Sequence, residues 1–280
     1  RPTSFSWSRL VPKSLREPQK MAFLIKKAWD LEKDFRKKRS GLHKYIVVGG
    51  TMGTGKSEFV RALAGFRPFK AKYFSEAWED NDELQMFYRL LGIWADPACR
   101  TSKSYRWITH DLKEVQGKVQ GWFAARKFIQ ALISMFDLPN FAVIQDTPLW
   151  QDGAYAETQY ELGLASEKNM AAYRKDSLWR QKLLPSYLKW PILVYVWAPF
   201  SVIRERVLKS RGRDFESQLP EGYLLRLHRN TLQWMLAMKQ KGVPVLVVDA
   251  GASDFRPGMS DRLPVVAKIW QEIDKIKNRI

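Results

Sequence analysis

The sequence predicts an α/β fold in which a five-stranded parallel sheet is flanked by helices and preceded by a basic helical arm. Five short apolar runs are rich in β-branched residues, which favours buried strands. Helical patterns separate these runs, as is typical of a parallel sheet covered on both faces. A glycine-rich turn joins the first strand to its helix. Because we find no internal repeat or Gly/Ser-rich linker, we expect an arm at residues 1–43 and one domain at residues 44–280.

The arm carries much of the positive charge. The whole chain has a formal net charge of +18, and residues 1–44 hold thirteen Lys/Arg against four Asp/Glu. Its opening, RPTSFSWSRLVPKSLREP, is rich in Ser and Arg and resembles the neighbourhood of a mitochondrial presequence. In QKMAFLIKKAWDLEKDFRKK, five apolar residues follow at helical spacing: Met21, Leu24, Ala28, Leu31 and Phe35. This helix must bury its apolar stripe against the body or against a partner.

The body is predicted to alternate strands with helices. Apolar runs such as YIVVGG, PILVYVWA and VPVLVVDA place the strands at residues 44–49, 70–75, 141–146, 192–198 and 243–249. Helical periodicity places the helices at residues 56–66, 80–95, 110–137, 155–188, 200–211, 220–241 and 263–278. The helices grow longer in the middle of the chain, which indicates a helical bundle beside the sheet.

Composition excludes several classes of protein. No apolar run approaches the roughly 20 residues that a helix needs to cross a bilayer. Cys99 is the only cysteine, so no internal disulfide can form. The positive charge favours acidic partners, but no basic run is interleaved with stacking aromatics, which makes nucleic acid an unexpected partner. Most of the 12 Trp fall in predicted helices, where core packing is the default and a subunit contact is the alternative.

The segment YIVVGGTMGTGKSEFV contains a phosphate-binding loop. It satisfies the pattern G-x-x-x-x-G-K-[ST], with a strand before it and a helix after it, as the mechanism requires. Backbone N–H groups and the helix N-terminus would bind phosphate oxygens, Lys56 would neutralise the β- and γ-phosphates, and Ser57 would ligate Mg²⁺. The predicted nucleotide-binding residues are Gly50, Thr51, Met52, Gly53, Thr54, Gly55, Lys56 and Ser57.

Four further segments surround this loop. The second strand ends at KYFSEAWED, which places Glu76 where a general base for a substrate hydroxyl would lie. The third strand ends at VIQDTPLWQD. After the fourth strand, Arg211 and Arg213 are placed to clamp phosphates from a mobile lid. The fifth strand leads into DAGASDF, a loop in position to meet the adenine.

Taken together, these segments resemble the deoxynucleoside kinase family from about residue 44 to 278, with a P-loop kinase fold. The lid is the most specific part of the resemblance, carried by Arg211, Arg213, Glu216, Pro220, Tyr223, Leu224, Leu227, His228 and Trp234. The resemblance implies that Glu76 is the catalytic base and that both lid arginines stabilise the transferring phosphoryl group. It also implies that Glu216 contacts the sugar 3′-hydroxyl.

One segment departs from the family pattern. Where the family has Glu-Arg-Ser at the end of the third strand, this chain has Gln145, Asp146 and Thr147. Asp146 inverts the local charge beside Glu76, so two carboxylates would repel phosphate. In an alternative alignment Asp146 serves as the metal acid, but no arginine is restored. The glutamine that reads the base in the family has only Gln116 and Gln120 as candidates here.

Other residues have weaker signals. Asp152 and Glu157 either face the sugar pocket or form a solvated helix start. Tyr73, Trp78 and Phe87 either line a base pocket or belong to the core. We expect His228 to serve in packing or hydrogen bonding rather than in catalysis.

Two functions fit this sequence. The first is a nucleotide-binding accessory subunit of a mitochondrial assembly, for which the family's precedent is the deoxynucleoside-kinase-like subunit of respiratory complex I. It would sit on the matrix side of the inner membrane and contact other subunits through its basic arm and a Trp-rich surface. The altered third-strand motif favours this function. The second is an active mitochondrial deoxynucleoside kinase that uses ATP and Mg²⁺; a P-loop factor of the mitochondrial ribosome is a further alternative.

Overall fold

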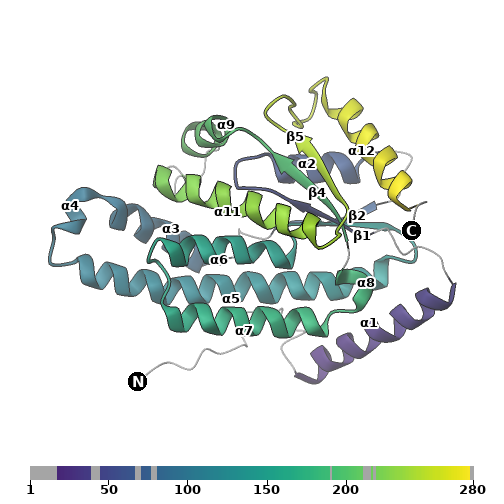
Figure 1. The fold of residues 1–280 in the computed structure, drawn as a ribbon, viewed down its shortest axis with the longest axis horizontal. Helices are drawn as coiled ribbons and strands as arrows, with labels where there is room; N and C mark the ends of the chain where they lie inside the picture. Colours follow the sequence, from purple (N-terminus) through teal and green to yellow (C-terminus); the bar gives the residue numbers. More distant parts are fainter. Residues whose placement is uncertain are drawn as a thin grey trace.

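The fold was obtained as a computed structural model that describes residues 18–38, 45–66, 71–76, 81–189, 191–210, 216 and 219–277. It is an α/β arrangement in which helices lie on both faces of one sheet (Figure 1). The strands are β1 (Tyr45–Gly49), β2 (Ala71–Phe74), β3 (Ala142–Asp146), β4 (Ile192–Trp197) and β5 (Val245–Asp249). All five predicted strands are therefore confirmed, with ends that shift by two residues at most.

The sheet has the order β2-β3-β1-β4-β5, and all pairings are parallel. β1 lies at the centre, and Val48 is in register with Asp146 of β3. The phosphate-binding loop therefore begins at the middle of the sheet's carboxyl edge, where the strand order allows loops from both sides to meet. The central strands are buried, as continuous apolar runs predict.

The two edge strands are less buried than a sheet covered on both faces requires. Tyr73 of β2 is 45% exposed and Val247 of β5 is 58% exposed.

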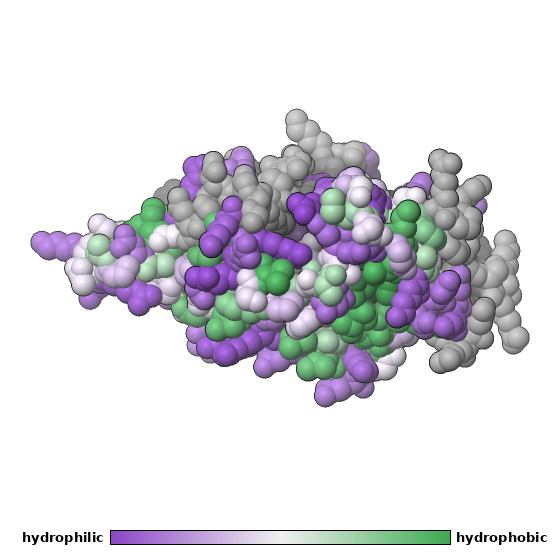
Figure 2. All heavy atoms as spheres, turned by 90° about the horizontal axis from the view of Figure 1, so that it is seen from above, coloured by the Kyte–Doolittle hydropathy of each residue, from purple (hydrophilic) through white to green (hydrophobic). Residues whose placement is uncertain are grey.

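Viewed from above, the described surface is mainly hydrophilic, with hydrophobic atoms grouped to the right of its centre (Figure 2). In the described part of the chain, no helix combines the length and the apolar character needed to span a membrane.

The helices before and around the sheet differ in length. They are α1 (Pro18–Lys38), α2 (Lys56–Ala64), α3 (Asp82–Ala95), α4 (Pro97–Arg100), α5 (Tyr105–Asp137), η3 (Leu149–Gln151), α6 (Asp152–Glu161), α7 (Glu167–Leu183), α8 (Ser186–Lys189), α9 (Phe200–Glu205), η4 (Arg206–Ser210), α11 (Glu221–Gln240) and α12 (Arg262–Lys277). α2 and α12 cover one face of the sheet, whereas α5 and α11 cover the other. α5, α6, α7 and α11 form the predicted bundle (Figure 1).

The predicted helix at residues 155–188 is wrong, because three helices occupy this segment. Gly163 ends α6 with a φ of 73° in a Schellman arrangement, in which the Leu164 N–H donates to the Gln159 carbonyl at 2.8 Å. Ser166 then caps α7 by accepting a hydrogen bond from the Asn169 N–H. Pro185 separates α7 from α8.

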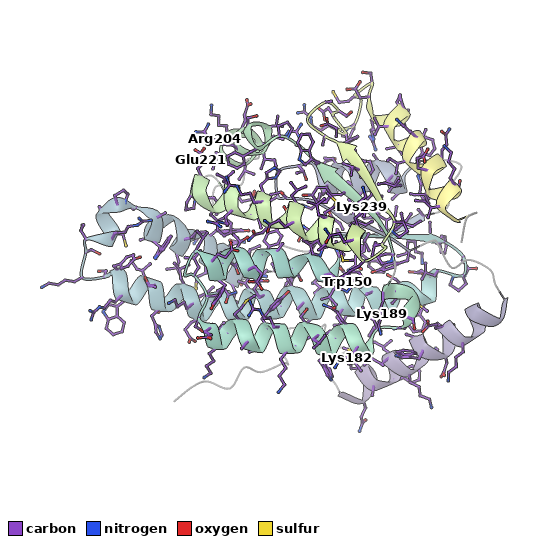
Figure 3. The ribbon with its side chains drawn as sticks, viewed as in Figure 1. Trp150, Lys182, Lys189, Arg204, Glu221 and Lys239 are labelled. Carbon is purple, nitrogen blue, oxygen red and sulfur yellow. The ribbon has the colours of Figure 1, made fainter. Side chains whose placement is uncertain are left out.

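Two other helix boundaries also differ from the prediction. α5 begins at Tyr105 rather than at residue 110, and the short α4 was not predicted. The predicted helix at 200–211 becomes α9 followed by the π-helical turn η4. Arg204 of α9 lies beside Glu221 at the start of α11, with 2.8 Å between Nε and Oε2 (Figure 3). This exposed pair links α9 to the start of α11 across the predicted lid.

The arm helix packs against the body. α1 confirms the helix expected at residues 19–38, and Ala28 of its apolar stripe is fully buried. Trp29 Nε1 donates to the Leu183 carbonyl at 3.0 Å, and Glu32 accepts from the Ser186 N–H at 3.1 Å. Helix α1 thus packs Met21, Ala28 and Leu31 of its stripe against the body, beside α5 and the end of α7 (Figure 1). The boundary at residue 43 lies outside the described residues and stays a prediction.

Candidate nucleotide site

The phosphate-binding loop connects β1 directly to α2. Gly50, Gly53 and Gly55 have φ values of 142°, 81° and 90°, a region that side chains disfavour. At Gly50, a Cβ atom would also lie 2.3 Å from the Val196 carbonyl oxygen. The sequence pattern therefore matches a real steric need, and the backbone can turn its N–H groups toward a ligand.

Lys56 lies at the start of α2 and folds back over the loop. Its ammonium group donates to the Thr51 carbonyl at 3.1 Å, and its side chain is buried. Thr54 Oγ1 donates to the same carbonyl at 2.8 Å, which closes the loop on itself. A buried cation beside the positive end of a helix provides an anion site for a polyphosphate.

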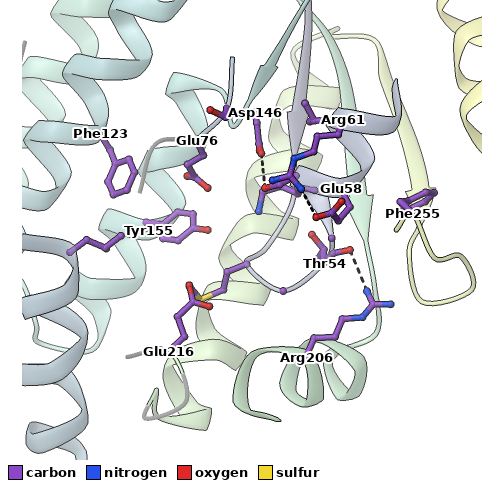
Figure 4. A pocket seen from close by; sticks show the side chains of 18 of the residues that line it. Thr54, Glu58, Arg61, Glu76, Phe123, Asp146, Tyr155, Arg206, Glu216 and Phe255 are labelled. Carbon is purple, nitrogen blue, oxygen red and sulfur yellow. Dashed lines mark hydrogen bonds and ion pairs between the residues drawn. The ribbon is translucent and has the colours of Figure 1, made fainter. Parts of the chain in front are cut away.

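Ser57 and Asp146 meet beside this loop. Ser57 Oγ donates to Asp146 Oδ2 at 2.8 Å, because the β1–β3 register places Asp146 next to the end of β1 (Figure 4). Burial raises the pKa of Asp146, and the charge of Glu76 raises it further. A hydroxyl and one carboxylate are the hard oxygen ligands that Mg²⁺ takes together with phosphates and water. This geometry is what the metal assignment of Asp146 requires.

Mg²⁺ would depend on these shared ligands. Among the described residues, no group of three or more His, Cys, Asp or Glu side chains is placed to hold a metal ion. Ser57 and Asp146 would bind Mg²⁺ together with phosphate oxygens and water.

Glu76 follows β2 and faces the same cavity. Its carboxylate lies 3.5 Å from Nζ of Lys127, a residue of α5. The Lys127 ammonium also donates to Asp152 at the start of α6, and both of these side chains are buried. Asp152 is therefore not part of a solvated helix start; it lies in the cavity wall.

A single cavity of about 1010 Å³ unites these elements. Its wall includes residues 52–57 of the phosphate-binding loop, but not Gly50 or Thr51, together with Glu76, Asp146 and the loop after β5 (Figure 4). Ser253, Asp254 and Phe255 of the DAGASDF segment line it, so this loop lies where the adenine prediction placed it. Arg206 joins the two sides, because its guanidinium donates to the carbonyls of Thr54 and Ala250.

Glutamines of α5 and α6 contribute to the cavity wall. Gln116 and Gln120 both donate to Gln159 Oε1, at 3.0 and 2.9 Å. Gln120 and Gln159 line the cavity, whereas Gln116 does not. Burial raises the pKa of the neighbouring Tyr223 to about 12, so its hydroxyl stays neutral. Of the two predicted base-reading candidates, Gln120 is therefore the one that reaches the cavity.

The remaining predicted residues fall into three groups. Met52, Tyr73 and Glu216 line the cavity, and Glu216 is buried. Phe87 belongs to a hydrophobic core, and Glu157 forms an exposed ion pair with Arg174. Three predicted residues lie outside the described residues: the lid arginines Arg211 and Arg213, and Trp78.

His228 serves in hydrogen bonding, as predicted. Its Nδ1 lies 3.2 Å from the Thr51 hydroxyl, which also contacts Thr231 at 2.6 Å. Burial lowers the pKa of His228, so the imidazole is neutral at pH 7.

The sequence did not identify Lys127 or Gln151 as site residues. Lys127 lies seven residues after Gln120, so helical periodicity puts both on one face of α5. A lysine within an otherwise apolar stretch of that face was the available signal. Gln151 had none, because its partner Gly50 is 101 residues away.

The fold and the site define a P-loop nucleotide-binding protein of the kinase type. The sequence profile described as Deoxynucleoside kinase matches residues 46–274. The chain belongs to the deoxynucleoside kinase family.

Comparison with individual proteins agrees with this assignment. The chain is 25% identical over 192 residues to a deoxyadenosine/deoxycytidine kinase of Bacillus subtilis (strain 168), covering 68% of this chain and 76% of the relative. Two structures of deoxyadenosine kinase from M. mycoides share the fold. The one with bound dCTP has a TM-score of 0.60 and 19% identity, covering 81% of this chain and 99% of the other. The one with bound dATP has a TM-score of 0.59 and 20% identity, covering 82% and 98%.

Proposed function

We propose that this chain is a kinase that transfers the γ-phosphoryl group of ATP to the 5′-hydroxyl of a deoxynucleoside. The observation that carries the proposal is the single cavity that contains the phosphate-binding loop, the Ser57–Asp146 pair and Glu76. Phosphoryl transfer needs a phosphate-binding site, ligands for a metal ion and a base that accepts the proton of the attacking hydroxyl, all in one space. This cavity offers these three sites to ATP and a deoxynucleoside together.

Each group has a role in this reaction. The N–H groups of the loop and the Lys56 ammonium bind the β- and γ-phosphates and stabilise the charge that builds up on them. Ser57 and Asp146 would hold Mg²⁺, which neutralises phosphate charge when it is bound. Glu76 accepts the proton of the 5′-hydroxyl as that oxygen attacks phosphorus. Gln120, Asp152 and Glu216 line the space for the nucleoside.

Deoxyadenosine and deoxycytidine are the first substrates to test. The Bacillus subtilis relative is named for both nucleosides, and the similar structures hold dCTP or dATP. Polar amides in the nucleoside region, Gln120 and Gln159, suit bases that present both donors and acceptors.

The test is transfer of labelled phosphate from ATP to deoxyadenosine, deoxycytidine, deoxyguanosine and thymidine. We expect a labelled monophosphate from at least one of them, and we expect Glu76→Gln to lower kcat by about 10²- to 10⁴-fold, the range for a lost general base. Glu114→Gln is the control, because Glu114 is an exposed carboxylate on α5. No turnover with any of the four nucleosides would contradict the proposal.

A second candidate is a nucleotide-binding accessory subunit of a mitochondrial assembly, with respiratory complex I as the first host and the mitochondrial ribosome as another. Gln145 and Asp146 favour it, since they replace the acid and the arginine of the family pattern. Gln145 is fully buried. Its amide oxygen accepts a hydrogen bond from the Tyr45 hydroxyl, and its amide nitrogen donates to the Lys127 carbonyl. A nucleotide would then stabilise the fold without turnover.

Partners would dock through the basic arm and exposed tryptophans. Trp107 and Trp179 are 73% and 51% exposed, which suits a subunit contact. Native gels of solubilised mitochondria test this candidate and the matrix location together. Co-migration with a megadalton complex, combined with no kinase turnover, would favour it over the kinase. Migration as a free protein, or absence from mitochondria, would contradict it.

A further inference from the structure

Lys127 is a buried cation behind two carboxylates of the cavity wall. It projects from α5 toward two carboxylates that other elements supply, Asp152 from α6 and Glu76 from the segment after β2. The side chains of Lys127 and Asp152 are 3% and 4% exposed, whereas that of Glu76 is 23% exposed. The ammonium therefore contacts Glu76 from the protein side while this carboxylate still faces the cavity.

This part of the cavity wall carries an excess of negative charge. Glu76, Asp146, Asp152 and Glu216 line the wall together with one cation of α5, Arg126, and the end of β3 supplies no cation. Several carboxylates around one space repel a polyphosphate and also one another. A positive charge on their buried side reduces both effects.

The ammonium is charged at neutral pH. Burial acts to lower the pKa of Lys127, but the charges of Asp152 and Glu76 outweigh burial and raise this pKa. The ring of Phe123, another residue of the cavity wall, lies 5.2 Å from the ammonium and holds the cation further in place.

We propose that Lys127 is the positioning residue for Glu76: it fixes the direction of this carboxylate and balances its charge, so that a hydroxyl and a polyphosphate can approach together. The inference rests on the proposed kinase function. Asp152 serves as the anchor of Lys127, because its buried carboxylate accepts a hydrogen bond from the ammonium. Lys127 acts through Glu76 and has no contact of its own with the reacting atoms.

The experiment compares Lys127→Met and Lys127→Arg with the wild-type chain. Met keeps the length of the side chain without the charge, and Arg keeps the charge. Lys118→Met is the matched control, since Lys118 is an exposed lysine on the same helix. The assay measures kcat and KM for the best deoxynucleoside, together with the affinity for a fluorescent ATP analogue.

We expect Lys127→Met to lower kcat by about 10²-fold or more, within the range for a lost acid–base function. ATP affinity should change much less than kcat, because in this role Lys127 contacts Glu76 and not the triphosphate, so that only a charge behind Glu76 is lost. Lys127→Arg should recover most of the lost kcat. Lys118→Met should match the wild-type chain.

A folding control separates positioning from stability. If Lys127→Met does not fold, the double variant Lys127→Met with Asp152→Asn removes both buried charges together and avoids an unpaired carboxylate. It should fold, bind the ATP analogue and still show the low kcat. Wild-type kcat in the folded single or double variant, or no recovery with Arg, would overturn the role of Lys127. No turnover by the wild-type chain would instead overturn this inference and the proposed kinase function together.

Discussion

The side-chain amide of Gln151 makes two hydrogen bonds to the backbone of Gly50. Its Oε1 accepts from the Gly50 N–H at 2.9 Å, and its Nε2 donates to the Gly50 carbonyl at 2.8 Å. Gln151 is fully buried, and a Cβ atom on Gly49 would lie 2.7 Å from the same Oε1. Gln151, in the segment after β3, therefore pairs with both the N–H and the carbonyl of Gly50, the first residue of the phosphate-binding loop.

Gln151→Leu should weaken this loop. It leaves a buried N–H and a buried carbonyl of Gly50 without partners, at a cost of about 1–3 kcal/mol each. We expect a lower melting temperature and a roughly tenfold weaker affinity for ATP, because the loop loses its preformed shape. Thermal unfolding and titration with a fluorescent ATP analogue measure the two effects. Gln271→Leu, at an exposed position on α12, is the control and should change neither. Unchanged ATP affinity in Gln151→Leu would contradict the clamp.

Lys56→Ala should lose nucleotide binding without unfolding the protein. Charge-assisted hydrogen bonds to phosphate contribute about 1.5–3 kcal/mol, so affinity for ATP should fall roughly 10- to 100-fold. The mutation removes a cation from the loop, and the remaining carboxylates then repel the triphosphate more strongly. Titration calorimetry with ATP and Mg²⁺ provides the measurement, and the exposed Lys268→Ala is the control. If the Ala variant binds ATP as well as the wild-type chain does, the triphosphate lies elsewhere.

Asp152 should make stability depend on pH. Burial raises the pKa of Asp152 from 3.8 to about 6, although the charge of Lys127 opposes this rise. The folded state then holds the proton more tightly than the unfolded state, so stability falls as pH rises from about 4 to about 6. Because each pKa unit corresponds to about 1.4 kcal/mol, the loss at Asp152 is on the order of 2–3 kcal/mol.

Urea unfolding at pH 4 and at pH 7 tests this dependence. Asp152→Asn cannot titrate, so its stability relative to the wild-type chain should rise between these two values. Glu114→Gln, which removes an exposed carboxylate on α5, should follow the wild-type curve. If the difference in the free energy of unfolding between Asp152→Asn and the wild-type chain is the same at pH 4 and at pH 7, Asp152 keeps an ordinary pKa.

Ala28→Asp should detach or destabilise the arm helix. Ala28 is fully buried in the core of the protein. A carboxylate at this position would therefore be buried without a partner. We expect a loss of about 2–5 kcal/mol, as for other buried unpaired polar groups. Ala22→Asp places the same charge on the solvent side of α1 and should stay within about 0.5 kcal/mol of wild type. Equal unfolding curves for the two variants would mean that α1 does not pack on the body in solution.

The sheet was predictable because its signals are local. A central parallel strand buries both faces, so β1, β3 and β4 appear as continuous apolar runs. The phosphate-binding loop was predictable for the same reason, since its glycines and Lys56 are adjacent in the chain. The break between α6 and α7 was also encoded, in Gly163 and Ser166, but the prediction joined the helical segments on either side into one helix.

The rest of the site depends on contacts between distant segments. Lys127 gains its role from Asp152 and Glu76, which belong to other elements and become neighbours only when α5 packs beside the sheet. From the sequence, Asp146 was interpreted as a departure from the family motif. In the structure, the register of β1 and β3 places it beside Ser57, which donates a hydrogen bond to it. Periodicity cannot supply such pairings, because each depends on the tertiary arrangement.

The hydroxyl of Thr51 ties the phosphate-binding loop to α11 through His228 and Thr231. That helix begins at Glu221, which is itself paired with Arg204 of α9. A displacement of α11 along its axis would therefore pull on the loop that receives the triphosphate, and filling of that loop would in turn restrain the helix. The phosphate-binding loop and α11 are thus joined by side-chain hydrogen bonds, although they lie about 180 residues apart in the chain.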